Sequence, residues 1–422
     1  MSALPPELLP DNATVDDQGR LSVAGLDLEM LAAHYGTPLF VYDEAHLRAR
    51  CRDAVAAFPG GAAYATKAFL CTAMARLAHE EGMQLDVATG GELHVALAAG
   101  VPPERLIMHG NNKSDLELRG ALECGVGRIV VDSFDELDRL EAIHAEGLGP
   151  TPILLRVTPG VEAHTHEFVS TGQDDSKFGF TVSTGAALAA VEQALASPAV
   201  ELTGVHAHIG SQVFRIESFF EAVRVIAGFA GRLGLPELSV GGGLGVAYVE
   251  GESAPTIAEW GRAVHDACEA TGVTATVSAE PGRAIVAQAA ITLYRVGTLK
   301  EIPGVRTYLS VDGGMSDNPR PVLYGSGYET FLPRATTADR PKIVTVVGKH
   351  CESGDRLVAD AKVPSDIRVG DVLATPVTGA YGHSMGSNYQ KVLRPPVVFV
   401  RDGEARLVVR RETYEDLVRF DL

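Results

Sequence analysis

Residues that can do chemistry follow short apolar runs in this sequence, and the first of them is Lys67. The run Ala62–Thr66 has the composition of a buried strand, and a helical pattern begins just after the lysine. A lysine at such a strand end would have its stem enclosed by apolar neighbours, which disfavours the ammonium and leaves an amine able to form a Schiff base. A lysine that extends its charge from the strand end into water is the alternative for this stretch.

A histidine and a run of glycines follow two later apolar runs. In HIGSQ, which begins at His208, a flat imidazole can lie against an aromatic ligand, and Ser211 can offer a hydroxyl to an anion. A buried histidine that bonds a backbone carbonyl would explain His208 equally well. Gly241, Gly242 and Gly243 allow backbone amides to converge on a phosphate, although a glycine-rich turn alone is weak evidence.

The segment Glu280-Pro281-Gly282-Arg283 closes the last run of this kind. Pro281 keeps Glu280 extended, and Gly282 permits a sharp turn. Arg283 can then place its guanidinium fork on a phosphate or a carboxylate. Glu280 can pair with a ring nitrogen and keep that nitrogen protonated.

Together these side chains predict a flat, phosphorylated ring with a basic nitrogen and an aldehyde, and pyridoxal 5'-phosphate (PLP) has all four properties. Lys67 would form the Schiff base, and His208 would cover one face of the ring. Glu280 would keep the pyridine protonated, so that the ring accepts electrons. The phosphate would be held by Gly241, Gly242, Gly243, Ser211 and Arg283.

The elements that must position these residues alternate between strands and helices. The expected strands are Ala62–Thr66, Met83–Ala88, Leu106–His109, Arg128–Asp132, Ile153–Thr158, Leu202–Ile209, Leu238–Gly241 and Thr274–Glu280. This count predicts a (β/α)8 TIM barrel, with a doubly wound sheet as the competitor. Polar residues or glycine stand at nearly every strand end, where such barrels carry their active sites. They include Asp86, which we assign to the cofactor site, and His109, Asp132 and Arg156.

The pattern changes after Gln288. Short β-rich runs separated by Pro, Gly, Asp and Asn turns predict an all-β domain over 289–422, folded as a β-barrel or a β-sandwich. The PLP-binding barrel is expected over 43–288. Residues 1–42 are expected to contribute the strand Leu39–Tyr42 to the β domain, and residues 1–20 to be loosely ordered.

The overall composition limits the partners. Hydrophobic residues make up 46% of the 422 residues and charged residues 21%, as in ordinary globular proteins. The net charge of −18 argues against nucleic acid or an anionic membrane as a partner. The five cysteines are scattered without a CxxC pair, so no disulfide framework and no metal site is expected, and a reducing cytoplasm fits. We find neither a signal peptide nor a membrane-spanning run in the sequence.

Three polar stretches lie in the β-rich region: DGGMSDNPRP from Asp312, GKHCESGD from Gly348 and TGAY from Thr378. By itself each could be a turn-rich loop. Cys351 stands beside His350, and it is either a proton donor or a small, partly buried residue.

With these stretches, the motifs YATKA, DVATGGEL, HGNNKS, GVEAHTHEF, KFG, HIGSQ, GGGLG and EPGR make the chain resemble the diaminopimelate decarboxylase family. That family is a branch of the PLP-dependent fold type III decarboxylases, which are related to ornithine decarboxylase and alanine racemase. The resemblance runs from about Leu39 to Thr413. The barrel motifs fit any fold type III decarboxylase, whereas GKHCESGD and DGGMSDNPRP point more narrowly to the diaminopimelate enzymes. The resemblance implies decarboxylation of meso-2,6-diaminoheptanedioate to L-lysine.

The resemblance also implies roles for single residues. Lys67, His208 and Cys351 would be catalytic, with Cys351 donating a proton in the active site of the other chain of a head-to-tail homodimer. The substrate would be bound by Arg283, Arg320, Tyr324, Glu352 and Tyr381, and Tyr381 would also touch the cofactor. The chain departs from the family at Gly382-His383, where Cys-Tyr is common, so the departure concerns the substrate side of the site.

Three other functions stay open. The nearest is a decarboxylase of another amino acid or of a carrier-linked one, although a distal ammonium would want an acidic pocket where this chain has Arg320. An amino-acid racemase would need a base on each face of the substrate carbon. A non-catalytic PLP-binding barrel would have no need of Cys351 and Glu352.

Overall fold

The computed structural model describes residues 5–160 and 175–422. Most of the stretch GVEAHTHEF, from Val161 onward, lies outside the described residues. The chain divides into two compact units. The barrel unit comprises Arg50–Val246 and Ala254–Ala284, and the β unit comprises Met1–Ala49, Ala247–Ser253 and Ile285–Leu422.

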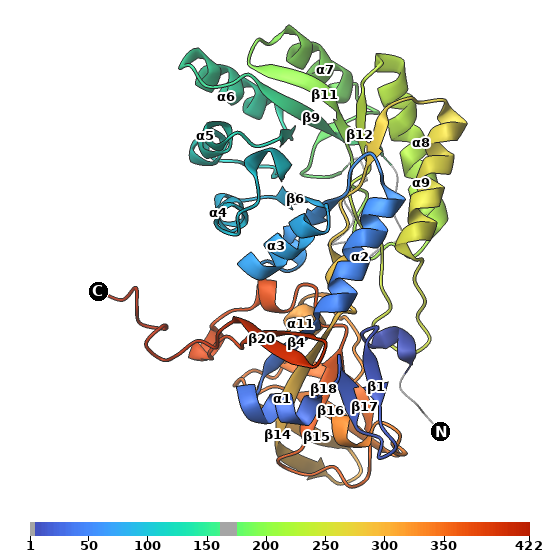
Figure 1. Ribbon diagram of the computed structural model, residues 1–422, viewed down its shortest axis with the longest axis vertical. Helices are drawn as coiled ribbons and strands as arrows, with labels where there is room; N and C mark the ends of the chain where they lie inside the picture. Colours follow the sequence, from blue (N-terminus) through green and yellow to red (C-terminus); the bar gives the residue numbers. More distant parts are fainter. Residues whose placement is uncertain (1–4, 161–174) are drawn as a thin grey trace. The chain divides into compact units, whose positions relative to one another are not determined.

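Parallel strands form the wall of the barrel unit (Figure 1). They are β5 (Ala63–Ala65), β6 (Gln84–Val87), β7 (Leu106–Met108), β8 (Arg128–Val131), β9 (Thr151–Thr158), β11 (Val200–His206), β12 (Glu237–Ser239) and β13 (Thr276–Ser278), paired in this order. The barrel closes because the amide of Ala63 donates to the carbonyl of Ala279 over 2.9 Å. Each strand overlaps an expected one, and closure confirms the (β/α)8 barrel over the doubly wound sheet. A short extra strand, β10 (Phe180–Thr181), pairs with the end of β9.

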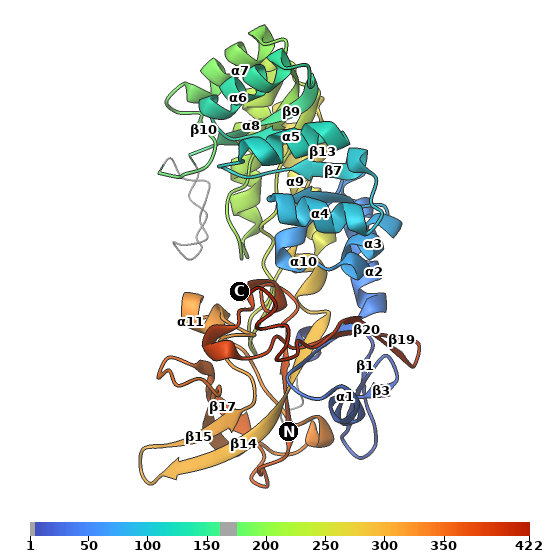
Figure 2. The same ribbon diagram turned by 90° about the vertical axis from the view of Figure 1, so that its left-hand side faces the viewer.

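Helices follow the strands. They are α3 (Thr72–Glu80), α4 (Gly90–Ala98), α5 (Asp115–Cys124), α6 (Phe134–Ala145), α7 (Ala186–Ala196), α8 (Ile216–Leu233) and α9 (Ile257–Thr271). Figure 2 shows α3 to α7 side by side in chain order, and α8 packs along α9 in Figure 1. Ser114 and Thr256 each begin their helix with a capping box, in which a glutamate three residues later bonds back. Two further helices, α2 (Glu44–Ala57) and α10 (Arg283–Val286), cross the limits between the units.

Apolar side chains fill the interior of the barrel. Ala63, Ile107, Val130 and Leu154 form one buried cluster. Because β5 and β9 are not neighbours in the sheet, their side chains can meet only across the inside. The interior is therefore a packed core, and the polar residues that follow the strands stand at its carboxyl end.

The β unit is organised around the long strand β14 (Ala290–Ile302). Its first half pairs with β4 (Leu39–Asp43) and β18 (Val372–Pro376), and its second half with β15 (Arg306–Val311). The rest of the sheet is formed by β16 (Lys342–Val347), β17 (Arg356–Val363), β19 (Val397–Arg401) and β20 (Glu404–Val409). The sheet carries two helices, α1 (Leu28–Tyr35) and α11 (Arg320–Tyr324). Since β4 pairs with both β14 and β19, this N-terminal strand is part of the sheet.

The expectation that residues 1–20 are loosely ordered is wrong for the part that the structure describes. Pro6–Leu8 form a 3-10 turn, and β1 (Ala13–Val15), β2 (Leu21–Val23) and β3 (Leu26–Asp27) form an antiparallel sheet. The amide side chain of Asn12 donates to Asp43 Oδ2 over 2.9 Å. These polar residues have partners within the fold, which composition alone does not reveal.

No described helix is long and apolar enough to span a bilayer.

Candidate active site

Lys67 lies in the 3-10 turn Thr66–Ala68 that follows β5. The turn is fixed because Thr66 Oγ1 donates to the carbonyl of Asp86, at the neighbouring strand, over 2.8 Å. The residues on both sides of the lysine are buried, but Lys67 itself is exposed. The expectation that apolar neighbours enclose its amine is therefore wrong for this chain, because the turn buries the flanking residues and leaves the lysine outside them.

His208 lies two residues beyond β11 and presents a neutral ring. The amide of Gly242 donates to its Nδ1 over 3.1 Å, so the ring carries its proton on Nε2. Desolvation, and next the positive charge of Lys67, hold the pKa of His208 well below its ordinary value. A flat, uncharged imidazole is thus fixed at the carboxyl end of the strands, within electrostatic reach of Lys67.

The glycines after β12 bring chain segments into close contact. Gly241 and Gly243 have left-handed backbones, with φ of 66° and 113°. A Cβ on Gly241 would meet the carbonyl oxygen of Ala207 at 2.4 Å, and one on Gly242 would meet that of Glu280 at 2.3 Å. The loop is therefore a cradle without side chains, as phosphate-binding loops of barrels are.

Arg283 and Ser211 add side-chain donors to this end of the barrel. The Nη2 of Arg283 donates to Ser211 Oγ over 2.8 Å, so a guanidinium and a hydroxyl lie side by side. The amide of Gly241 donates to Ser239, and the amide of Gly242 donates to His208. Because these two amides already have acceptors, an anion bound here would need hydrogen-bond donors from other groups. The arginine–serine pair offers such groups next to the glycine loop.

Pro281 and Gly282 join the last strand of the barrel to the first. The carbonyl of Pro281 accepts from the amide of Ala65 over 3.2 Å. A Cβ on Gly282 would lie 2.9 Å from the carbonyl oxygen of Ala65, so the close approach needs glycine. This contact places the segment of Arg283 beside the strand that ends in Lys67.

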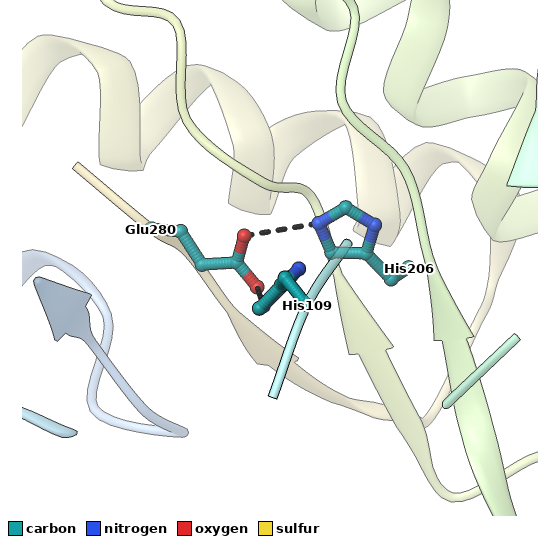
Figure 3. Close-up of side chains that lie close together, drawn as sticks. All are labelled: His109, His206 and Glu280. Carbon is teal, nitrogen blue, oxygen red and sulfur yellow. Dashed lines mark hydrogen bonds and ion pairs between the residues drawn. The ribbon is translucent and has the colours of Figure 1, made fainter. Parts of the chain in front are cut away.

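Glu280 is the centre of a buried polar cluster (Figure 3). Its Oε2 lies 2.9 Å from His206 Nε2, and its Oε1 accepts from the hydroxyl of Ser239 over 2.9 Å. His109 Nε2 lies 3.4 Å from Oε1. Burial raises the pKa of Glu280, but the interactions of its carboxylate with His206 and His109 outweigh burial and hold the pKa well below its ordinary value. Glu280 is therefore a carboxylate at neutral pH.

His206, which sequence reasoning missed, was detectable in principle. It stands two residues before His208, and alternate residues of a strand share a face. His109, His206 and Glu280 each place a ligand atom within 4.8 Å of the others, a spacing that can hold a metal ion. Because the contact between His206 and Glu280 has hydrogen-bond length, we interpret the group as a carboxylate held by two imidazoles.

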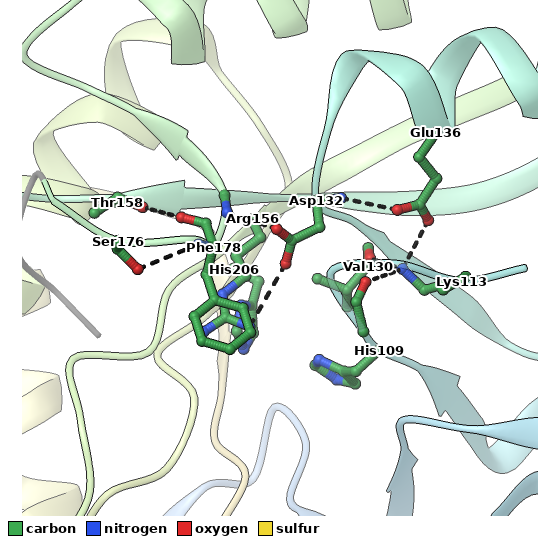
Figure 4. Close-up of polar contacts among 12 residues, drawn as sticks. His109, Lys113, Val130, Asp132, Glu136, Arg156, Thr158, Ser176, Phe178 and His206 are labelled. Atoms are coloured by element: carbon green, nitrogen blue, oxygen red, sulfur yellow. Dashed lines mark hydrogen bonds and ion pairs between the residues drawn. The ribbon is translucent and has the colours of Figure 1, made fainter. Parts of the chain in front are cut away.

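Further ion pairs connect the polar strand ends. Arg156 Nη1 lies 3.6 Å from Asp132 Oδ2, and its guanidinium lies 4.1 Å from the ring centre of Phe178 (Figure 4). His109 Nε2 lies 3.6 Å from Asp86 Oδ1. The strand ends named from the sequence are thus brought together, with opposite charges facing each other.

Lys113, in the stretch HGNNKS, is a buried cation that sequence reasoning did not assign. Its Nζ donates to Glu136 Oε1 and to the carbonyl of Val130, each over 2.7 Å (Figure 4). It also donates to the carbonyl of Gly110 over 2.8 Å. All three ammonium protons have acceptors, which is how a buried charge is tolerated. We interpret Lys113 as a structural residue of the barrel wall.

In the β unit, Arg320 is a buried cation among aromatic rings. It is 4% exposed, its Nη1 donates to the hydroxyl of Tyr328 over 2.6 Å, and its guanidinium lies 4.2 Å from the ring centre of Tyr248. Within the described part of the chain, no carboxylate pairs with it. A buried guanidinium with neutral protein neighbours suits an anionic ligand.

The stretches GKHCESGD and DGGMSDNPRP are held together by Asp355. Its Oδ1 accepts from the amide of Met315 over 2.7 Å, and its Oδ2 lies 2.7 Å from His350 Nδ1. Asp355 and His350 are buried, whereas Cys351 and Glu352 between them are exposed. The loop therefore presents a thiol and a carboxylate outward from a fixed base.

A second buried aspartate, Asp317, fixes the stretch DGGMSDNPRP. The hydroxyl of Tyr294 donates to its Oδ2 over 2.6 Å, and the amide of Gly314 donates to its Oδ1 over 2.8 Å. Burial outweighs these hydrogen bonds and, with the nearby charge of Asp355, raises the pKa of Asp317 to about 7. The last two residues of this stretch, Arg320 and Pro321, begin a short helix that ends at the half-buried Tyr324.

Tyr381 and the two residues after it form a constrained turn. Tyr381 has a φ of 60°, a conformation that residues other than glycine rarely adopt. A Cβ on Gly382 would lie 3.0 Å from the carbonyl oxygen of Thr378. Burial, and next the charge of Arg394, lower the pKa of His383 to about 4. At the two positions where the chain departs from the family pattern, it therefore has a tightly packed glycine, Gly382, followed by a neutral histidine, His383.

The candidate residues fall into two groups. The barrel unit holds Lys67, Asp86, His208, Ser211, Gly241, Gly242, Gly243, Glu280, Pro281, Gly282 and Arg283, and the β unit holds Arg320, Tyr324, Cys351, Glu352 and Tyr381. The first group offers an amine, a flat imidazole, a buried carboxylate and donors for an anion. The second offers a buried guanidinium, phenols and an exposed thiol.

The fold and the first group define a pyridoxal-dependent decarboxylase barrel. The family model described as pyridoxal-dependent decarboxylase, pyridoxal binding domain, matches residues 44–287. The diaminopimelate decarboxylase of Mycobacterium tuberculosis is 48% identical over 440 residues, covering 99% of this chain and 98% of the relative, and that of Bacillus subtilis is 46% identical over 430 residues, covering 96% of each. The chain belongs to the diaminopimelate decarboxylase family.

Solved structures agree with this assignment. The structure of diaminopimelate decarboxylase from M. jannaschii in co-complex with L-lysine has a TM-score of 0.91 and 32% sequence identity, and the match covers 98% of each chain. The barrel and the β unit therefore both have their counterparts in a decarboxylase of known structure.

Proposed function

We propose that this protein is a PLP-dependent decarboxylase that converts meso-2,6-diaminoheptanedioate to L-lysine and carbon dioxide. The relatives over its whole length are diaminopimelate decarboxylases, and a related structure carries L-lysine, which is the product of this reaction. The observation that carries the choice of substrate is the buried Arg320, which pairs with no carboxylate among the described residues. A dicarboxylic amino acid brings a second carboxylate that can pair with this guanidinium.

The residues of the barrel unit fit the cofactor. Lys67 supplies an accessible amine for its aldehyde, and Glu280 supplies an ionised carboxylate for its ring nitrogen. His208 supplies a neutral ring, and Arg283 with Ser211 supplies donors beside a loop in which a Cβ has no room. When bound, PLP withdraws electrons from the bond to the departing carboxylate.

The chain's own groups then have distinct tasks. Glu280 keeps a proton on the ring nitrogen, which it can do because it is a carboxylate at neutral pH. Arg320, with Tyr324, Glu352 and Tyr381, binds and orients the substrate. Cys351 delivers the proton that replaces the carboxylate, and its exposure suits a thiol that acts outside its own chain.

We include in this proposal a head-to-tail homodimer in which each active site takes Lys67 from one chain and Cys351 from the other. A two-fold axis makes this exchange reciprocal. For the chain itself we propose a barrel over 43–288, flanked by segments 1–42 and 289–422 that form the β domain. A cytoplasmic location agrees with the cysteines, none of which forms a disulfide among the described residues.

Other substrates are disfavoured by the same residues. Lysine/ornithine decarboxylase of Vibrio vulnificus shares the fold at 23% identity, but a diamino acid without a distal carboxylate would place an ammonium where this chain has Arg320. A racemase needs a base on each face of the substrate carbon. A non-catalytic barrel gives no reason for the thiol and carboxylate of Cys351 and Glu352.

The deciding experiment is incubation of the purified protein and PLP with single amino acids, followed by chromatography of the products. meso-2,6-Diaminoheptanedioate should give L-lysine, while L-ornithine and L-lysine should be left unchanged. Release of putrescine from ornithine would assign the protein to the neighbouring decarboxylases. Inversion of configuration without carbon dioxide would assign it to the racemases.

A further inference from the structure

We propose that His206 and His109 are positioning residues that fix the Glu280 carboxylate for the ring nitrogen of the cofactor. They thereby set the pH at which the absorption spectrum of the bound cofactor changes. The inference deepens the proposed function and rests on it, because it requires PLP at Lys67. The sequence motifs named only Glu280 as the partner of the ring nitrogen. The inference adds the two histidines that contact Glu280.

Three strands of the barrel hold the carboxylate in place. His206 ends β11 and lies 2.9 Å from Glu280 Oε2, and Ser239 ends β12 and donates to Oε1 over 2.9 Å. His109 follows β7 and lies 3.4 Å from Oε1 (Figure 3). The two imidazole rings pack edge to face, with centroids 5.0 Å apart. Because both oxygens have neighbours on barrel strands, the carboxylate cannot turn without losing one of these contacts.

The two histidines contribute differently to the charge of Glu280. Burial lowers the pKa of His109, but Asp86 and Glu280 outweigh it and raise the pKa above its ordinary value, which favours a positive ring. At His206 burial prevails over Glu280 and lowers the pKa, which favours a neutral ring. Its Nδ1 has no hydrogen bond within the described residues, as expected when the single proton sits on Nε2. One histidine thus supplies charge and the other a hydrogen bond.

Other charged groups around this cluster also affect the ionisation of Glu280 and of its two histidines, some favouring the charged form and some opposing it. Among the described residues, the further titratable or charged side chains with the largest effects on Glu280 or on its two histidines include Asp86, Arg156 and His208. Arg156 also favours an ionised Glu280, but it lies 3.6 Å from its own partner, Asp132. The closest contacts to Glu280 are therefore the two histidines and Ser239, and only the histidines can carry charge.

The spectrum of the bound cofactor reports this arrangement. An ionised Glu280 stabilises a proton on the ring nitrogen, and the positive ring repels a second proton on the nitrogen that joins the cofactor to Lys67. If the Glu280 carboxylate interacts less strongly with the ring nitrogen, that nitrogen loses its proton and the ring loses its positive charge. The nitrogen that joins the cofactor to Lys67 then keeps its own proton to higher pH. The pH midpoint of the visible absorption change should then rise, by about one unit or more.

The test is a pH titration of the visible spectrum of the holoenzyme. Variants His109→Leu and His206→Leu should each shift the midpoint upward, toward the value of Glu280→Gln. Combining either with Glu280→Gln should add no further shift, because all three act through one carboxylate. His206→Gln keeps a neutral donor and should retain the parental midpoint. His265→Leu is the matched control, since His265 bonds the carbonyl of Ala57.

Parental midpoints in both leucine variants, with cofactor bound, would overturn the inference. A merely structural role would lower the amount of bound cofactor or the unfolding temperature without moving the midpoint. If a leucine variant does not fold, His109→Gln takes its place, because it removes the charge and keeps an amide; a parental midpoint there overturns the inference as well. Absence of a cofactor band in the parent would instead contradict the proposed function.

Discussion

Glu280 in the barrel unit and Asp317 in the β unit are both buried carboxyl groups, yet their pKa values move in opposite directions. Burial raises both, but at Glu280 two imidazoles outweigh it and hold the pKa well below its ordinary value. At Asp317 the partners are neutral donors, Tyr294 and Gly314, with Asp355 nearby, and the pKa rises to about 7. Neighbouring charge, and not burial, decides which carboxyl is ionised at neutral pH.

The two units also differ in how they present their reactive groups. In the barrel unit the groups stand at strand ends and bond one another, so their positions are fixed within the barrel. In the β unit, Cys351 and Glu352 are exposed on a loop that is fixed by the buried Asp355. We therefore expect changes in the barrel unit to affect cofactor binding, and changes in the β unit to affect turnover or substrate choice.

Replacement of Lys67 should have the largest effect. Lys67→Ala removes the only amine assigned to the cofactor's aldehyde, so we expect loss of the covalent adduct and of measurable decarboxylation. Borohydride reduction followed by peptide mass spectrometry measures the adduct. Lys177→Ala, a change of another lysine in the barrel unit, is the control and should keep the adduct. A reduced adduct on a different lysine of the variant would refute the assignment.

The barrel could be predicted from the sequence because its strands are short, apolar and evenly separated by helical segments. Eight such strands close this barrel, and in the sequence Lys67, Glu280 and Arg283 follow the apolar runs of its first and last strands. The second half of β14 could not be predicted from hydrophobic patterning, because that half is largely exposed and pairs only with β15, so it lacks an apolar signal.

Contacts between distant parts of the chain could not be predicted. Arg320 is enclosed by Tyr248, which belongs to a segment that interrupts the barrel unit in the sequence, and no local pattern links the two. The exposure of Lys67 also depends on a single turn whose geometry is not encoded in hydrophobic periodicity. Cys351 gained a role only through the resemblance, since a thiol on a polar loop has many explanations.

Replacement of Cys351 should separate turnover from cofactor binding. Cys351→Ala should keep the cofactor at Lys67 and lose nearly all turnover, because the proton donor is missing. When it is mixed with Lys67→Ala under conditions of subunit exchange, about half of the dimers are mixed, and each of these has one intact site. Recovery should approach about one quarter of the parental activity, measured as L-lysine formed. Exchange without recovery would contradict a shared site.

Replacement of Arg320 should weaken substrate binding by a smaller factor. Arg320→Ala leaves the distal carboxylate of the substrate unpaired, so kcat/KM for meso-diaminoheptanedioate should fall by about 30-fold or more, the equivalent of ~2 kcal/mol. The cofactor spectrum should not change. Arg368→Ala is the control, since the Arg368 side chain is 79% exposed. Unchanged kcat/KM in a folded Arg320→Ala protein would remove Arg320 from the substrate site.

Replacement of Asp317 should change the pH dependence of stability. Its pKa is about 7 in the folded protein and near 3.8 when unfolded, so the folded state binds more protons between these values. Stability should therefore fall as the pH rises from about 4 to about 7, by up to a few kcal/mol, or roughly 1.4 kcal/mol for each unit of pKa shift. Asp317→Asn, which resembles the protonated acid, should remove that fall.

Urea unfolding at pH 4.5 and pH 8 measures this difference. The variant should be close to the parent at the lower pH and exceed it clearly at the higher pH, because there the parent holds an unfavourable buried charge. Asp402→Asn is the matched control, since the Asp402 side chain is 83% exposed, and it should change neither value. If the variant is less stable than the parent at pH 8, the ionised carboxylate of Asp317 stabilises the folded state at that pH. The contrast with Glu280 would then be wrong, and the hydrogen bonds from Tyr294 and Gly314 would be strong enough to overcome burial.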